Sequence, residues 1–224
     1  MALDVIHVDN HLLVVAKPAG LLSQGDASGD RSLVDLARDW LRENYAKPGN
    51  VYVGLVHRLD RNASGVVVLA RTSKAAARLS ACFRDERVDK TYLAVCERRP
   101  QPAAGDLLHW LAAAGDARGV TRAEGAPFPG GRESRLAYRV LESAAGGSLL
   151  EVCPETGRRH QIRAQLALCG HPLLGDVKYG AAKRLPGQRV ALHALSLVIA
   201  HPVGGRAMKF ECPLPADWPW PPPA

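Results

Sequence analysis

Short apolar runs of five to nine residues, each bounded by turn-forming residues, recur along most of this chain. Runs of that length are typical of β-strands and too short for fully buried helices. Between some of them, apolar residues stand three and four positions apart, which is the spacing of one helix face. The chain therefore alternates strand and helix signals, and we expect a mixed α/β fold.

The pattern places individual elements. Strands are expected at residues 4–8, 12–16, 51–55, 65–70, 91–95, 136–141, 148–152, 192–200 and 208–212, with hairpins around residues 9–11, 144–147 and 202–205. One helix is expected to start at Ser32 and to stop at residues 47–50, one to be capped by Thr72 or Ser73, and one to cover residues 160–169. Residues 99–133 lack a sustained period, which predicts a surface insertion or extended loop.

The C-terminal segment is rich in proline. Residues 213–224 include Trp218, Trp220 and a run of prolines, which excludes regular helix and central strand. We expect this tail to be polyproline II packed on the surface through its two tryptophans. A proline-rich ligand for a partner domain is the alternative.

Length and charge set the class of protein. The 224 residues suit one domain, and the hydrophobic share of 47% with 23% charged residues excludes fibrous, low-complexity and wholly disordered chains. The formal net charge of +7 favours anionic partners, with nucleic acid first and an acidic membrane second. A surface charge that only keeps the protein in solution is the competing explanation.

The cysteines and the N-terminus indicate where the protein works. Five scattered cysteines without a C-x-x-C pair make a disulfide framework and a zinc site unexpected. The first residues show no basic region followed by an apolar run, and no stretch is apolar for long enough to cross a membrane. We therefore expect a cytoplasmic protein with no membrane partner and no metal.

The polar segment at residues 57–64, between two apolar runs, is the first candidate site. Asp60 is its only carboxylate, flanked by Arg58 and Arg61. A buried nucleophile or base must stay ionised at neutral pH, which requires a nearby cation, and Arg163 is a distant residue that folding could supply. A salt bridge at the end of a strand, without catalysis, is the alternative.

A second basic cluster, GRRHQIR at residues 157–163, opens the third expected helix. Arg159 and Arg163 are four apart and are predicted to share a helix face, where the helix N-terminus favours phosphate. A solvated basic surface is the alternative for Arg158 and Arg159.

Four ordered motifs resemble the RluA-type pseudouridine synthases. HRLDRNASG at residues 57–65 resembles the family's catalytic HRLDxxTSG motif, and LVVAKPAG at residues 13–20 resembles its first motif. KTYLA at residues 90–94 resembles its K-x-Y-x-A segment. GRRHQIR at residues 157–163 followed by GHPLLGD at residues 170–176 resembles its GRTHQIR and GHPIxGD stretch. Together these motifs span most of the chain.

The resemblance implies a fold and an activity. The fold is the pseudouridine synthase catalytic fold, a single domain over residues 1–224 with a largely antiparallel central sheet, flanking helices and a central cleft. The activity is isomerisation of uridine to pseudouridine in ribosomal or transfer RNA by flipping the base, breaking its glycosidic bond and rejoining it through C5. It needs no cofactor, and we expect a monomer.

The resemblance also implies roles for single residues. Asp60 matches the catalytic aspartate, which attacks the ribose anomeric carbon or removes a proton from the sugar. Tyr92 matches the tyrosine that packs on the target base, and Arg163 matches the arginine that pairs with the catalytic carboxylate. Arg58 matches the arginine that fills the space left by the flipped nucleotide. The remaining residues expected to bind substrate are Arg61, Arg159, His160 and Ile162.

The chain departs from the family pattern at two positions, and two other functions compete. Ala63 and Arg159 stand where the family usually has Thr. The first motif starts too early for an S4 RNA-binding domain, so the catalytic domain is expected to recognise the RNA itself. An RNA-binding protein that has lost catalysis is one alternative. A phosphotransferase, suggested by His-Arg-Leu-Asp, is another, but the chain lacks the kinase glycine-rich loop and Asp-Phe-Gly.

Overall fold

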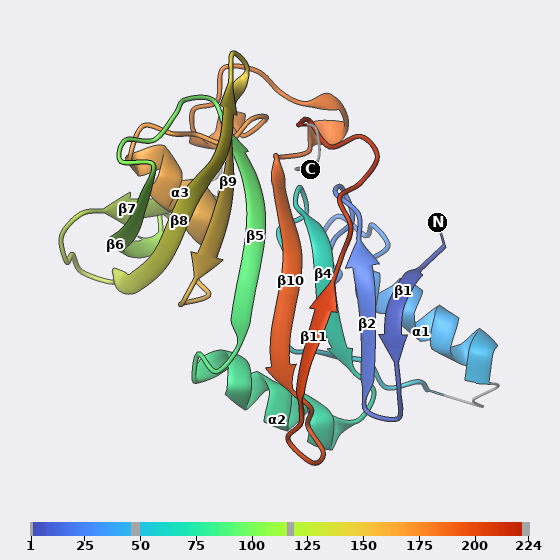
Figure 1. The fold of residues 1–224 in the computed structure, drawn as a ribbon. Helices are drawn as coiled ribbons and strands as arrows, with labels where there is room; N and C mark the ends of the chain where they lie inside the picture. The colour runs from blue at the N-terminus through green and yellow to red at the C-terminus, as the bar shows by residue number, and fades with distance from the viewer. Residues whose placement is uncertain (1, 46–49, 116–118, 221–224) are drawn as a thin grey trace. The chain divides into compact units, whose positions relative to one another are not determined.

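The computed structural model describes residues 2–45, 50–115 and 119–220. Its helices are α1 (Leu33–Tyr45), α2 (Ser73–Arg84) and α3 (Gln161–Leu168), with short 3-10 turns η1 (Val177–Tyr179) and η2 (Pro186–Gln188). Its strands are β1 (Asp4–Val8), β2 (Leu12–Lys17), β3 (Gly54–Leu55), β4 (Ser64–Ala70), β5 (Asp89–Cys96), β6 (Ala104–Ala113), β7 (Thr121–Glu124), β8 (Arg132–Ala144), β9 (Gly147–Pro154), β10 (Leu192–Ala200) and β11 (Ala207–Glu211) (Figure 1).

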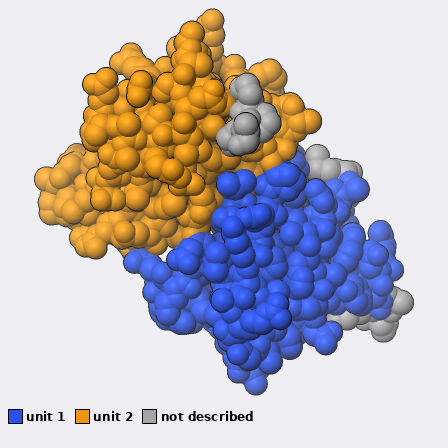
Figure 2. Space-filling model, in the orientation of Figure 1, with its two compact units in different colours: residues 1–89, 195–213 blue, residues 90–194, 214–224 orange. Residues whose placement is uncertain are grey.

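The chain forms two compact units. The first consists of residues 1–89 and 195–213, and the second of residues 90–194 and 214–224 (Figure 2). The pairings β1–β2, β2–β4, β5–β9 and β8–β9 are all antiparallel, which confirms the predicted mixed α/β class with a largely antiparallel sheet.

In the first unit, β4 lies at the centre of the sheet. Strand β2 pairs along one edge of β4, from Leu12 opposite Ala70 to Lys17 opposite Gly65. Strand β10 neighbours β4 on the strand path, β1 continues the sheet beyond β2, and β11 pairs with β10. All seven residues of β4 are buried, as expected for a β-branched run covered on both faces.

The predicted hairpins and helix starts in this unit are confirmed. Ser32 and Asp35 form a reciprocal cap at α1, because the Ser32 N–H donates to the Asp35 carboxylate at 3.0 Å and the Asp35 N–H donates to Ser32 Oγ at 3.4 Å. Thr72 is the α2 cap, with Oγ1 accepting from the Ala75 N–H at 3.1 Å. The stop of α1 is predicted at residues 47–50, of which residues 47–49 lie outside the described residues.

The strand predicted at residues 51–55 is mostly wrong. Only Gly54 and Leu55 pair with a neighbour, opposite Ala70 and Leu69. A strand has two edges, and β4 gives one to β2 and the other to β10 as well as β3. Residues 51–53 have β-forming side chains but no free strand edge to pair with. They therefore lead in irregular conformation to the Asp60 loop.

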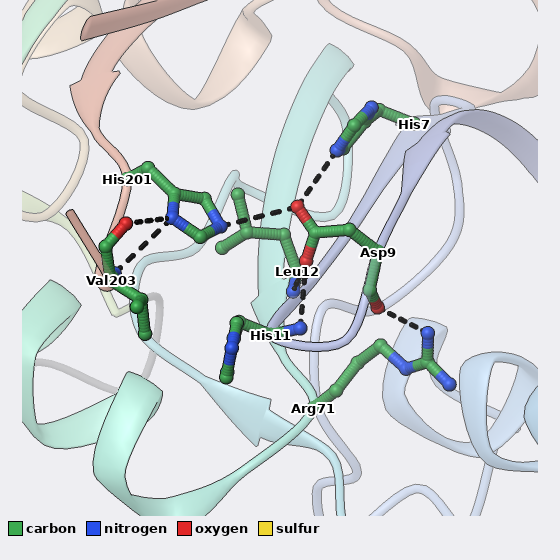
Figure 3. A network of polar contacts seen from close by, with 7 residues as sticks. All are labelled: His7, Asp9, His11, Leu12, Arg71, His201 and Val203. Carbon is green, nitrogen blue, oxygen red and sulfur yellow. Dashed lines mark hydrogen bonds and ion pairs between the residues drawn. The ribbon is translucent and has the colours of Figure 1, made fainter. Parts of the chain in front are cut away.

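A polar network joins the β1–β2 turn to the end of β10 (Figure 3). Asp9 Oδ1 accepts from the backbone N–H groups of His11 and Leu12 at 2.7 and 2.8 Å, which fixes the turn. Asp9 Oδ2 lies 3.0 Å from His7 Nε2 and 3.2 Å from His201 Nε2, and Arg71 donates to the Asp9 carbonyl. Partial burial raises the pKa of Asp9, but these hydrogen bonds and the nearby His201 lower it to about 2.

In the second unit the strand order is β5-β9-β8-β6-β7, and α3 packs against β6 and β7. The predicted hairpin at residues 136–152 is confirmed and extends to Arg132 and Pro154. Its two-residue turn ends at Gly147, which has φ +138°, and a Cβ there would lie 2.2 Å from the Cys96 carbonyl oxygen. Only glycine fits this close approach of two backbones.

The loop predicted at residues 99–133 is wrong. This segment contains β6 and β7, and β6 pairs with β8 from Ala104 opposite Arg139 to Leu111 opposite Arg132. Most positions of β6 are exposed or half-buried, so its sequence does not show the alternation that marks a strand with one buried face. The strand forms because the long strand β8 provides a backbone edge for it.

The C-terminal tail packs through its tryptophans, as predicted for residues 213–220. The Trp220 side chain is buried and its Nε1 donates to Glu142 at 3.1 Å. The Trp218 ring meets His193 edge-on, with centroids 5.9 Å apart. The prolines at residues 221–223 lie outside the described residues.

Candidate active site

Asp60 lies on the loop between β3 and β4, in the first unit. Leu59 before it and Ala63 after it are buried, whereas Arg58 and Arg61 are exposed. The Ala63 N–H donates to the Asp60 carbonyl at 3.1 Å and closes a turn around the aspartate. Two apolar anchors thus hold the ends of a turn whose charged side chains face outward, with Asp60 half-buried between them.

Ser23 holds the backbone immediately before Asp60. Its hydroxyl donates to the Leu59 carbonyl at 2.7 Å and accepts from the Leu59 N–H at 3.2 Å. The serine is 5% exposed, so both backbone groups of Leu59 are satisfied away from water by one side chain. No local sequence pattern marks Ser23, because its contact with Leu59 spans 36 residues of chain.

Lys17 holds the backbone immediately after Asp60. It is 1% exposed, and its Nζ donates to the carbonyls of Leu21, Pro18 and Arg61 at 2.8, 2.9 and 3.3 Å. Burial lowers the pKa of Lys17 to about 7, opposed by the Asp60 carboxylate and assisted by Arg61. Three acceptors match the three protons of an ammonium group, so the geometry favours the charged form facing the Asp60 loop.

Arg61, a predicted substrate ligand, makes several contacts within the protein. Its Nε donates to the Gly20 carbonyl at 3.0 Å, its Nη2 binds Asp30 at 2.7 Å, and its carbonyl accepts from the Gly20 N–H at 2.7 Å. Residues 17–23, which overlap the segment 13–20 that resembles the family's first motif, therefore hold the aspartate loop along its length.

His57, at the start of the motif, has a structural role. Its Nε2 lies 2.9 Å from the Val68 N–H and accepts from it, and its ring stacks on Phe83 with centroids 4.4 Å apart. The imidazole thereby fastens the loop to β4 and α2.

The second unit carries Tyr92 and Arg163. Tyr92 is half-buried on β5, opposite Val152 of β9. Arg163 lies on α3 and is 4% exposed. Its Nε and Nη2 donate to the two carboxylate oxygens of Asp176 at 2.7 and 2.8 Å. This bidentate pair orients the guanidinium, which also lies 5.0 Å from the Tyr179 ring centroid. Pairing of Arg163 with Asp60, which the family resemblance implies, stays a prediction.

The start of α3 differs from the prediction. The helix begins at Gln161, so Arg159 precedes it and does not share a helix face with Arg163. Gln161 Oε1 accepts from the Arg158 N–H at 2.9 Å and from Thr156 Oγ1 at 2.7 Å, which turns the chain before the helix. Gln161 thus closes the preceding turn with its own side chain, a contact that helix periodicity does not indicate.

His160 and Ile162, two predicted substrate ligands, have different environments. His160 has a left-handed backbone with φ 52°, and its Nδ1 lies 2.8 Å from the Tyr179 hydroxyl. Tyr179 accepts from the Thr121 N–H at 2.8 Å, so its own proton is available to His160. Burial raises the pKa of Tyr179, which keeps that proton in place. Ile162 is 5% exposed and packs in the core.

Neither a metal site nor a membrane-spanning helix occurs in the described residues. Over residues 2–45, 50–115 and 119–220, no three His, Cys, Asp or Glu side chains group together in a way that could hold a metal ion. Over the same ranges, no helix combines the length and apolarity needed to cross a bilayer.

Comparison with known proteins identifies the family. A family model described as RNA pseudouridylate synthase matches residues 11–168. A ribosomal large subunit pseudouridine synthase D from Zymomonas mobilis is 35% identical over 96% of this chain and 70% of its own length. One of the same description from Pseudomonas aeruginosa is 34% identical over 97% of this chain and 70% of its own length.

Solved structures agree with the sequence relatives. Human RNA Pseudouridylate Synthase Domain Containing 4 has a TM-score of 0.78 and 25% identity, covering 95% of this chain and 89% of its own. Human RNA Pseudouridylate Synthase Domain Containing 1 has a TM-score of 0.73 and 28% identity, covering 95% and 84%. These comparisons exclude the phosphotransferase alternative. The chain belongs to the RNA pseudouridylate synthase family of isomerases.

Proposed function

We propose that this protein converts uridine to pseudouridine in large-subunit ribosomal RNA, with Asp60 as the catalytic carboxylate. The observation that carries the proposal is the Asp60 loop itself. Hydrogen bonds from Ser23, Lys17 and Ala63 hold the backbone on both sides of the Asp60 side chain. That side chain is the only carboxylate of the loop. Relatives described as large-subunit synthases supply the choice of RNA. Transfer RNA is the second candidate substrate, from the family resemblance.

The chemistry is redox-neutral and keeps every atom of the nucleotide. The N1–C1′ bond breaks, a C5–C1′ bond forms, the C5 proton is lost and N1 gains a proton. Asp60 would attack C1′ or remove a proton from the sugar, and Tyr92 would pack on the base and assist loss of the C5 proton. A base inside a helix is out of reach, so the enzyme must extrude it, and Arg58, exposed beside Asp60, would fill the vacated stack.

The proposal extends to the whole protein. The two compact units would act together as one catalytic domain, as a monomer in the cytoplasm, without metal or organic cofactor. An isomerisation requires no external oxidant, reductant or group donor, which supports the absence of a cofactor. The proposed substrate-binding residues are Arg58, Arg61, Arg159, His160 and Ile162, and the proposed catalytic residues are Asp60, Tyr92 and Arg163.

Replacement of Asp60 tests the proposal. Asp60→Asn keeps the size of the side chain and removes its charge, so pseudouridine formation is expected to fall to background while the urea unfolding midpoint stays near that of the wild type. Asp4→Asn, at an exposed position of β1, is the matched control and should retain full activity. Reactions with ribosomal and transfer RNA transcripts in EDTA, read by carbodiimide labelling and primer extension, measure the product.

The outcomes separate the alternatives. Product with wild type and Asp4→Asn alone supports the assignment and names the RNA. Turnover by Asp60→Asn removes Asp60 from the mechanism. Binding of either RNA by wild type without product would instead favour an RNA-binding protein that has lost catalysis.

A further inference from the structure

A basic cavity of about 310 Å³ lies in the second unit, built from residues other than the proposed catalytic ones. It forms where the end of β6, the start of β7, the start of β8 and the segment before α3 meet. Its lining contains three arginines, two glycines and four small or apolar residues, and no carboxylate: Leu111, Ala112, Ala113, Thr121, Gly130, Arg132, Gly157, Arg158 and Arg159.

We propose that this cavity, here called the arginine cradle and consisting of Arg132, Arg158 and Arg159 around its walls, binds a backbone phosphate of the RNA. The assignment rests on the proposed function, because RNA is the polyanion that function supplies. It adds a binding site on the β6–β7 region, where the sequence indicated only a loop.

Two of the cradle arginines, Arg132 and Arg159, differ from their neighbours in their ion pairing. Nearby arginines outside the cavity are paired, Arg135 with Glu133 and Arg122 with Glu124. Over the described ranges, no carboxylate forms an ion pair with Arg132 or Arg159, and both residues are exposed. Exposed guanidiniums without a carboxylate partner are available to a phosphate, whose oxygens their planar fork fits.

Two hydrogen bonds to backbone carbonyls hold the segments that carry the cradle. Thr121 Oγ1 donates to the Arg159 carbonyl at 3.1 Å, which ties the segment before α3 to β7. Arg158 Nε donates to the Glu133 carbonyl at 3.3 Å, which directs its guanidinium toward the start of β8. Two side chains are thus brought to the cavity wall by contacts that hold their own segments in place.

A second cationic group lies near Arg159. Arg159 Nη2 lies 3.1 Å, and Lys178 Nζ 3.7 Å, from the point that a Cβ of Gly119 would occupy. An anion bound near Arg159 would interact favourably with both groups. Gly119 leaves the space in which both groups meet.

The lining favours phosphate over a base. No aromatic side chain lines the cavity, so a nucleobase would have nothing to stack on. The floor made by Leu111 and Ala112 offers no side-chain donor or acceptor to read a base edge. Arginine forks on an apolar floor bind the charged backbone and are indifferent to sequence.

Salt-dependent binding tests the proposal. We compare wild type with Arg132→Gln/Arg159→Gln, and with the matched control Arg184→Gln/Arg206→Gln, which removes the same charge from exposed positions elsewhere. Filter binding to a large-subunit ribosomal RNA transcript is measured from 50 to 300 mM NaCl. Each lost phosphate contact lowers the slope of log Kd against log salt by about 1, so the cradle variant, which loses one phosphate, should lose about 1 and bind about tenfold more weakly.

The outcomes distinguish the cradle from the proposed function. A cradle variant with the slope and Kd of the control overturns the cradle, and a slope lost only in the cradle variant supports it. Pseudouridine formation by wild type on the same transcript tests the proposed function separately, because filter binding does not depend on turnover. Urea unfolding of each variant shows that the loss of binding is not a loss of folding. In the active enzyme, the cradle substitutions should raise KM.

Discussion

At the scale of single residues, Asp60 is positioned by contacts to its neighbours' backbone. Ser23 binds both backbone groups of Leu59, and Lys17 binds the carbonyl of Arg61, so the peptide units on either side of the aspartate are fixed. Catalytic groups displaced by about 1 Å lose around a hundredfold in rate. We infer that Ser23 is a positioning residue for Asp60.

The Ser23→Ala substitution should lower both stability and rate. It leaves the buried N–H and carbonyl of Leu59 without partners, which costs about 1–3 kcal/mol of the free energy of unfolding, measured by urea titration. Single-turnover pseudouridine formation should slow at least about tenfold, with less change in RNA affinity. Ser73→Ala, exposed at the first position of α2, is the control. A rate equal to wild type would limit Ser23 to a structural role.

At the scale of elements, separate hairpins of the first unit are joined by one carboxylate. Asp9 caps the β1–β2 turn and also reaches His201, at the end of β10 (Figure 3). The His7 ring lies against Phe210 of β11, with centroids 5.3 Å apart. The contacts of Asp9 and His7 therefore link the β1–β2 hairpin to the β10–β11 hairpin.

Asp9 should contribute stability that depends on pH. Its pKa of about 2 lies below the ordinary 3.8, so the folded state favours the ionised form. This contribution is fully present above about pH 4 and is lost as the pH falls toward 2. Asp9→Asn should lower the free energy of unfolding by about 1–2 kcal/mol at pH 6 in urea titrations. The gap should close on acidification, unlike that of the control Asp4→Asn, and a constant gap between pH 6 and 3 would contradict the assignment.

At the scale of the whole molecule, the net charge and the fold both suit an RNA substrate. The net charge of +7 is unfavourable for a compact chain on its own and favourable for binding a polyanion. The cradle and the exposed Arg58 show charge placed at particular positions rather than spread evenly.

Association with RNA should therefore be strongly salt-dependent. Between 50 and 200 mM NaCl, the affinity of the wild type for a ribosomal RNA transcript should fall at least about tenfold, because each bound phosphate releases counterions. Filter binding at five salt concentrations gives the slope, and potassium glutamate in place of chloride controls for anion competition. A flat profile would mean that the charge only keeps the protein in solution.

Local patterns were enough to predict much of this protein. The hairpins at residues 4–16 and 136–152, the Thr72 cap and the helix at residues 161–168 follow from alternation, spacing and turn residues, which are properties of neighbours in the chain. Asp60 stood out as the single carboxylate in a polar segment between apolar runs, and the four ordered motifs indicated the family that the comparisons confirm.

Only the tertiary structure decided the features that depend on distant partners. Strand β6 forms because β8 provides a strand edge for it to pair with. Strand β3 is short because it shares one edge of β4 with strand β10. The Ser23 and Lys17 contacts to the Asp60 loop, and the Arg163–Asp176 pair, join residues that no local period relates. Backbone hydrogen bonds and buried ion pairs are satisfied by whichever group lies near in space, and sequence proximity does not specify that group.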